Sequence, residues 1–148
     1  MGSASEVWDE YAPSFDLQAD HGLRDREVRD AWWAVLSSVL PDAPARIADL
    51  GCGTGSVTTL LAEHGVLVEG IDISPDMLRI ARAKEAQIAP AASCVEGDAG
   101  DPPLQPGAFD AVFCRHVLWV FDDQDAVLPR WIRLLRPGAR LIHATVLS

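Results

Sequence analysis

Residues 47–55 read Ile-Ala-Asp-Leu-Gly-Cys-Gly-Thr-Gly, an apolar run followed by three glycines at alternate positions. Glycines at this spacing let the backbone turn tightly and approach a ligand with no Cβ in the way. A helix that begins near Ser56 would direct its free N–H groups at that ligand. About 20 residues after the first glycine, a second apolar run ends in Asp72, where a carboxylate can accept hydrogen bonds from both hydroxyls of a ribose. Together the loop and the carboxylate predict a nucleoside-binding site.

The chain beyond this loop alternates between short apolar runs and helical patterns. Strands that are apolar on both faces belong to a parallel sheet that helices cover on both sides. Right-handed crossovers between such strands give a doubly wound α/β sheet. We therefore expect a Rossmann-like fold with helices on both faces and five parallel strands in the order 3-2-1-4-5. The predicted strands are Arg46–Leu50, Val66–Ile71, Ser93–Val95, Phe109–Cys114 and Ala139–Val146.

Local signals predict the helices. Residues 26–40 carry apolar side chains at helical spacing, and a short helix after the glycine loop is expected to stop at Gly65. Ser74 and the proline after it are typical of a helix start. We expect residues 1–45 to form an N-terminal helical cap and residues 46–148 to form the α/β core, within one structural domain.

The last predicted helix begins near Asp123. Pro129 is expected within its first turn, because a proline further along would remove a helical hydrogen bond. Arg136-Pro137-Gly138 is expected to end the helix before the fifth strand.

Composition limits the function classes. The chain has 148 residues, enough for one ordinary domain, with 49% hydrophobic and 23% charged residues. Its net charge of −10 argues against binding a bare phosphate backbone, which needs clustered Lys and Arg. The three cysteines, Cys52, Cys94 and Cys114, suit neither a disulfide framework nor a CxxC metal site. No apolar run approaches the ~20 residues of a spanning helix and no secretory signal pattern is present, so we expect a cytoplasmic protein with no membrane, nucleic-acid or metal partner.

Five motifs at the expected strand ends and turns resemble those of the class I S-adenosylmethionine-dependent methyltransferases, and the segment 115–119 looks most like that of the bacterial small-molecule type. They occur in the order and spacing of that family and cover the chain from about Arg46 onward. One such motif would be weak evidence, whereas five in register are specific. The motifs are Asp49-Leu50-Gly51-Cys52-Gly53-Thr54-Gly55, Gly70-Ile71-Asp72-Ile73-Ser74, Gly97-Asp98-Ala99, Phe109-Asp110-Ala111-Val112 and Leu134-Leu135-Arg136-Pro137-Gly138.

The resemblance implies S-adenosylmethionine as cofactor, S-adenosylhomocysteine as product, and a small molecule as methyl acceptor. Asp72 would bind the ribose and Ile73 would pack on the adenine, while Tyr11 would belong to an N-terminal cap over the cofactor. Asp98 and Ala99 would meet the adenine edge, although Asp98 alone is equally a solvated carboxylate at a strand end. The residues implied at the methionine end are Asp49, Gly51, Cys52, Gly53, Thr54 and Gly55.

The segment 115–119 would line the place where methyl donor and acceptor meet. In-line displacement from a sulfonium requires alignment of the reacting atoms and exclusion of water. A general base is needed only for a hydroxyl or a protonated amine, and His116 is the candidate catalytic residue. His116 is also explained as a structural histidine that bonds a backbone carbonyl. Arg115 is a candidate for the cofactor carboxylate or for an acidic acceptor, and a solvated role is equally open.

Two alternatives differ in function class. An NAD(P)-dependent oxidoreductase would need a GxGxxG loop, but Ser56 stands where a loop from Gly51 needs Gly or Ala, and Thr58 breaks a loop from Gly53. A non-catalytic S-adenosylmethionine-binding module, or a fragment of a longer protein, would explain why the chain ends just after the fifth strand. The edge of that strand would then carry unpaired backbone groups. We therefore expect a homo-oligomer formed through this edge if no further chain covers it.

Overall fold

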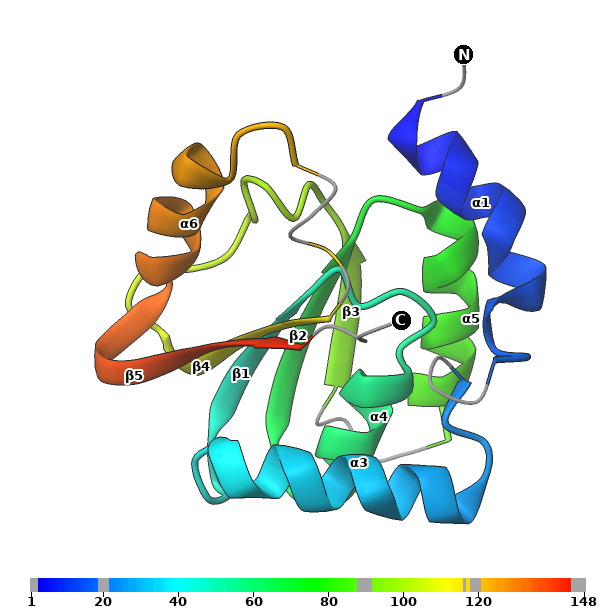
Figure 1. The fold of residues 1–148 in the computed structure, drawn as a ribbon, viewed down its shortest axis with the longest axis horizontal. Coiled ribbons are helices and arrows are strands. Elements are labelled where there is room, and N and C mark those ends of the chain that lie inside the picture. Colours follow the sequence, from blue (N-terminus) through cyan, green and yellow to red (C-terminus); the bar gives the residue numbers. More distant parts are fainter. Residues whose placement is uncertain (1–2, 19–21, 88–91, 116, 118–120, 145–148) are drawn as a thin grey trace.

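The computed structural model describes residues 3–18, 22–87, 92–115, 117 and 121–144. Five parallel strands form one sheet in the order β3-β2-β1-β4-β5 (Figure 1), which confirms the predicted order. The strands are β1 (Arg46–Leu50), β2 (Leu67–Asp72), β3 (Ala92–Glu96), β4 (Phe109–Arg115) and β5 (Leu135–Ala144). The helices are α1 (Ala4–Phe15), α3 (Arg26–Val39), α4 (Ser56–Glu63), α5 (Pro75–Glu85) and α6 (Gln124–Ile132).

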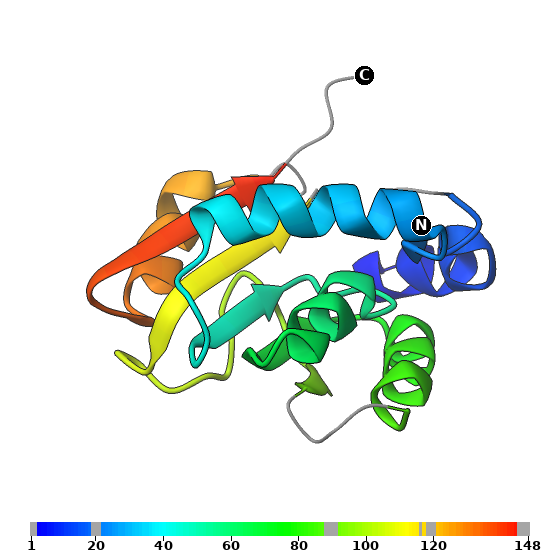
Figure 2. The same cartoon turned by 90° about the horizontal axis from the view of Figure 1, so that it is seen from below.

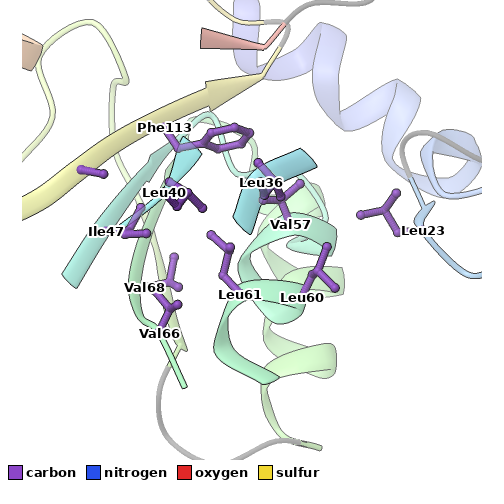
Figure 3. Close-up of a cluster of buried hydrophobic side chains, with 11 residues drawn as sticks. Leu23, Leu36, Leu40, Ile47, Val57, Leu60, Leu61, Val66, Val68 and Phe113 are labelled. Atoms are coloured by element: carbon purple, nitrogen blue, oxygen red, sulfur yellow. The ribbon is translucent and has the colours of Figure 1, made fainter. Parts of the chain in front are cut away.

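Helices cover both faces of the sheet, as expected. On one face, leucines and valines of α3 and α4 pack against β1, β2 and β4 (Figure 3). On the other face, Val127 and Trp131 of α6 pack against β1 and β4. The central strands β1 and β4 are thus buried by a helical layer on either side, which is the arrangement that their residues require, whereas β3 and β5 are more exposed.

The N-terminal helix α1 lies beside α5 in both views (Figures 1 and 2). A capping box at Ser3 and Glu6 begins α1, which lies within the segment 1–45 expected to be helical. The helix α3 begins at the cap Asp25, in agreement with the predicted start at Arg26. Within the part of the chain that the structure describes, no helix has both the length and the apolar character that crossing a bilayer requires.

Two expectations about the C-terminal region are wrong. Pro129 lies inside α6, beyond its first turn, although Asp123 caps the helix as predicted. Arg136-Pro137-Gly138 does not end the helix, which stops at Ile132, but lies inside β5. The pairing of β4 with β5 shifts here, from Phe109 opposite Leu135 to Ala111 opposite Arg140, so these residues form an outward excursion of the strand.

Candidate cofactor site at the carboxyl ends of the strands

The glycine loop between β1 and α4 has the backbone conformation that its sequence requires. Gly51, Gly53 and Gly55 have φ angles of +75°, +58° and +76°, a region that strains other residues. A Cβ at Gly51 would lie 2.2 Å from Cγ2 of Val117, and one at Gly55 would lie 2.9 Å from Cβ of Ala81. Gly55 also precedes the first turn of α4, so the loop leads directly into the positive end of a helix.

Asp72 connects the glycine loop to the start of α5. Its Oδ2 accepts a hydrogen bond from the Gly53 N–H at 2.8 Å, and its Oδ1 accepts one from the Ser74 N–H at 2.9 Å. Burial raises the pKa of Asp72, and these backbone hydrogen bonds oppose the rise. A carboxylate has about four acceptor positions, so both oxygens retain capacity for hydroxyl donors.

Asp49 lies deeper than Asp72, with 2% of its surface exposed. Its Oδ2 accepts a hydrogen bond from the hydroxyl of Thr58 in α4 at 2.7 Å. Burial raises the pKa of Asp49 to about 6, while the Thr58 hydrogen bond and the charge of Arg115 act in the opposite direction. The structure thus places Asp49 between the end of β1 and the first turns of α4.

The side chains within the loop point into the protein. A Cβ at Gly70 would lie 2.8 Å from Sγ of Cys94 and 3.0 Å from Sγ of Cys52, so the two thiols occupy the space that a side chain there would need. Contact with Cys94, together with burial, raises the pKa of the Cys52 thiol. Thr54 is also buried, and its hydroxyl donates to Asp16. Backbone groups therefore form the part of the loop available to a ligand.

The third strand end is held by α6. Asp98 is exposed and its Oδ1 accepts a hydrogen bond from the Gly100 N–H at 2.8 Å. Ala99 is buried, and its carbonyl accepts a hydrogen bond from Nε1 of Trp131 at 2.6 Å. Ile73 follows Asp72 and is 37% exposed, so an exposed apolar side chain comes directly after this carboxylate.

The other predicted site residues have different surroundings. Tyr11 lies on α1 with 57% of its surface exposed, and its ring centre is 6.1 Å from that of Trp8. Arg115 ends β4 and places its guanidinium 5.0 Å from the centre of the Trp32 ring. The candidate catalytic residue His116 lies outside the described residues. Among those that are described, no group of three or more His, Cys, Asp or Glu side chains is arranged to hold a metal ion.

Sequence reasoning missed the residues through which α1 docks onto this edge. Asp9 accepts hydrogen bonds from the Ser74 hydroxyl at 2.5 Å and from the Asp76 N–H at 3.1 Å. Asp16 forms an ion pair with Lys84 of α5 at 2.7 Å. The helix start at Ser74 was a usable signal, because its hydroxyl also accepts from the Met77 N–H as an N-cap. Nothing in the local pattern indicated its distant partner.

Comparison with known proteins decides the family. A family model described as a methyltransferase domain matches residues 48–143. The chain belongs to this methyltransferase family. The resemblance to class I S-adenosylmethionine-dependent methyltransferases is thereby confirmed.

Individual members of the family are similar over different lengths. A ubiquinone biosynthesis O-methyltransferase of Xanthomonas oryzae pv. oryzae is 32% identical over 147 residues, which are 97% of this chain and 57% of that protein. The chain thus spans little more than half the length of this curated relative.

Two solved structures of methyltransferases share the fold. An S-adenosylmethionine-dependent methyltransferase from Mesorhizobium loti has a TM-score of 0.67 and 30% identity, covering 76% of this chain and 52% of that one. Phospholethanolamine N-methyltransferase 2 of Haemonchus contortus has a TM-score of 0.67 and 29% identity, covering 76% of this chain and 27% of that one. The latter was solved with phosphomonomethylethanolamine and S-adenosylhomocysteine.

Proposed function

We propose that this chain binds S-adenosylmethionine and transfers its methyl group to a small-molecule acceptor. Family membership supports the reaction class, and the Haemonchus structure provides a relative bound to S-adenosylhomocysteine. The names of these relatives differ: one is an O-methyltransferase of ubiquinone biosynthesis, and the other is an N-methyltransferase solved with phosphomonomethylethanolamine. They therefore support a small-molecule acceptor without selecting the atom that is methylated.

The observation that carries the proposal is the bond between the Gly53 N–H and Asp72. It brings the glycine loop and the ribose-binding candidate together at the ends of neighbouring strands. The φ of Gly53 suits glycine, and a Cβ there would meet only the Phe15 ring, at 3.7 Å and beyond. The residues therefore fit a nucleoside with an amino-acid end: loop amides for the methionine portion, Asp72 for the ribose hydroxyls, Ile73 for the adenine face, and Asp98 with Ala99 for its edge.

The protein's part in the reaction would be to align the reacting groups and exclude water. When bound, S-adenosylmethionine supplies an activated methyl group on a sulfonium with a neutral thioether as leaving group. His116 would accept a proton from a hydroxyl or amine acceptor, since histidine titrates near neutral pH. Arg115, at the end of β4, would hold the cofactor carboxylate or an acidic acceptor.

We further propose that residues 1–45 act as a cap over the α/β core of residues 46–148, with Tyr11 facing the cofactor. Asp9 supports this role, because its bonds to Ser74 and Asp76 hold α1 at the end of β2. Self-association through β5 is proposed because this strand lies at one edge of the described sheet. Light scattering at high micromolar concentration should detect a dimer, and a monomer would contradict this part of the proposal.

Side-by-side calorimetric titrations with S-adenosylmethionine and with NADH test the function. Binding of the first ligand alone is expected, and binding of NADH alone would support the oxidoreductase instead. Turnover on a panel of hydroxyl, amine and thiol acceptors separates an enzyme from a non-catalytic binding module. The test should include both this chain and a longer chain if one is encoded, because the relatives extend further.

A further inference from the structure

A buried polar network joins the end of α1 to the glycine loop and to α5. Asp16, the residue that follows α1, accepts a hydrogen bond from the Thr54 hydroxyl at 2.5 Å and forms the ion pair with Lys84 at 2.7 Å. Lys84 Nζ also donates to the hydroxyls of Ser56 at 3.0 Å and Thr54 at 3.3 Å. Three segments distant in sequence thus meet at one ammonium group.

The network is partly shielded from water. The Asp16 side chain is 8% exposed and that of Lys84 is 27% exposed. Burial lowers the pKa of Lys84, and the hydrogen bond and charge of Asp16 counteract this. Removing one partner of such a pair leaves the other charge buried without compensation, which is strongly unfavourable. The pair therefore constrains the relative positions of α1 and α5 more firmly than a fully exposed ion pair would.

The hydroxyl groups transmit this constraint to the glycine loop. Thr54 lies between Gly53 and Gly55, whose backbones are intrinsically free to adopt other conformations. Ser56 completes the attachment, because its hydroxyl donates to the Gly22 carbonyl at 3.1 Å. A Cβ at Gly22 would lie 2.1 Å from the Asp16 carbonyl oxygen, so Gly22 packs directly against the backbone of Asp16.

We infer that Asp16 and Lys84 are positioning residues that hold the glycine loop in the conformation that binds the amino-acid end of S-adenosylmethionine. This inference rests on the proposed function. Phe15, which precedes Asp16, approaches the same loop, with its ring 3.7 Å from the place of a Gly53 Cβ. The ion pair thus sets both the loop backbone and the aromatic residue that adjoins it.

The test compares two ligands that differ only at the end in question. S-adenosylhomocysteine contains the amino-acid portion, whereas 5′-methylthioadenosine retains the adenine, ribose and thioether but lacks it. For Asp16→Asn we expect about a tenfold loss of affinity for S-adenosylhomocysteine, with little change for 5′-methylthioadenosine. Lys84→Arg keeps the charge of the ion pair. Unlike Asp16→Asn, it is expected to retain most of the wild-type preference for S-adenosylhomocysteine over 5′-methylthioadenosine.

A double variant guards against simple unfolding. Asp16→Asn combined with Lys84→Met removes both charges, so no uncompensated ion is left in the interior. It should fold, as circular dichroism would show, and still lose selective affinity for S-adenosylhomocysteine. The matched control is Glu69→Gln, which breaks the cross-strand pair with Arg46, 2.9 Å long, and should leave both affinities unchanged.

The outcomes separate this inference from the proposed function. Wild-type protein that binds neither adenosine ligand would contradict the proposed function. Wild-type protein that binds both, together with a folded double variant of unchanged ligand preference, would overturn the positioning role alone. Equal weakening of both ligands would also overturn it, since the effect would then be general rather than confined to the glycine loop.

Discussion

The two ends of the sheet use aspartates in opposite ways. At the carboxyl end, Asp72 accepts backbone N–H groups on both oxygens, and no ion pair among the described residues involves it. At the amino end, Oδ2 of Asp110 accepts from the Arg46 N–H at 2.8 Å while its Oδ1 pairs with Arg136. Asp110 joins β1, β4 and the excursion of β5. Two aspartates from recognisable motifs thus have different partners: Asp110 meets a cation and a strand amide, whereas Asp72 meets backbone amides. The proposed function assigns the remaining acceptor positions of Asp72 to a ligand.

The largest effect at the carboxyl end is expected for Gly53→Val. A β-branched residue at a φ of +58° is strained, and its side chain would enter the space beside Phe15. We expect the affinity for S-adenosylhomocysteine to fall by about 100-fold or more, measured by calorimetry. Gly107→Val is the matched control, since Gly107 has a φ of +66° with nothing near its Cβ position. Equal losses in the two variants would show that strain alone, rather than the ligand-facing position, causes the effect.

Asp72→Ala should weaken binding of S-adenosylhomocysteine by about 1.5–3 kcal/mol, because hydrogen bonds to a charged group are lost. Unchanged affinity in calorimetry would contradict the ribose assignment. The same variant also removes the acceptor of the Gly53 N–H, so a melting curve must accompany the titration.

Asp49→Asn should change the pH dependence of stability. Because the pKa of Asp49 is raised to about 6 in the folded protein, the unfolded chain loses this proton first as pH rises. The folded state is therefore penalised increasingly from about pH 4, and the penalty is complete above pH 6. The neutral amide should raise the free energy of unfolding at pH 7.5 by about 3 kcal/mol and leave it little changed near pH 4. Urea denaturation at the two pH values measures this, and an equal change at both would rule out ionisation as the cause.

Asp110→Ala is expected to have the smallest effect on function and a moderate one on stability. It leaves the Arg46 N–H without its acceptor and Arg136 without its carboxylate, at a cost of about 1–2 kcal/mol because the Arg136 side chain is largely exposed. Chemical denaturation should show this loss while ligand affinity stays at the wild-type value. Weakened ligand binding with unchanged stability would contradict the structural role assigned to Asp110.

The sequence predicted most accurately what neighbouring residues determine. The glycine loop, the cap at Ser74 and the strand order follow from spacing within short segments and from the handedness of crossovers. The docking of α1 was not predictable in this way, because Asp9 meets Ser74 and Asp16 meets Lys84 across more than 60 residues. One prediction from proline and glycine was wrong. Pro137 and Gly138 indicated the end of a helix, yet they lie within β5, where the strand bends outward. Proline and glycine therefore predict that the backbone is irregular at a position, but they do not tell whether that position lies in a helix, a strand or a loop.

Helix α6 is joined to the loop after β3 by hydrogen bonds as well as by apolar packing. Trp131 binds the Ala99 carbonyl, and Arg130 binds the Gly100 carbonyl at 3.1 Å, so a helix on one face of the sheet sets the shape of a loop at its rim. In the proposed complex this rim is where the nucleobase is read. The affinity for cofactor analogues with altered purines would then depend on α6. A chimaera that carries α6 of a relative would bind such analogues as that relative does.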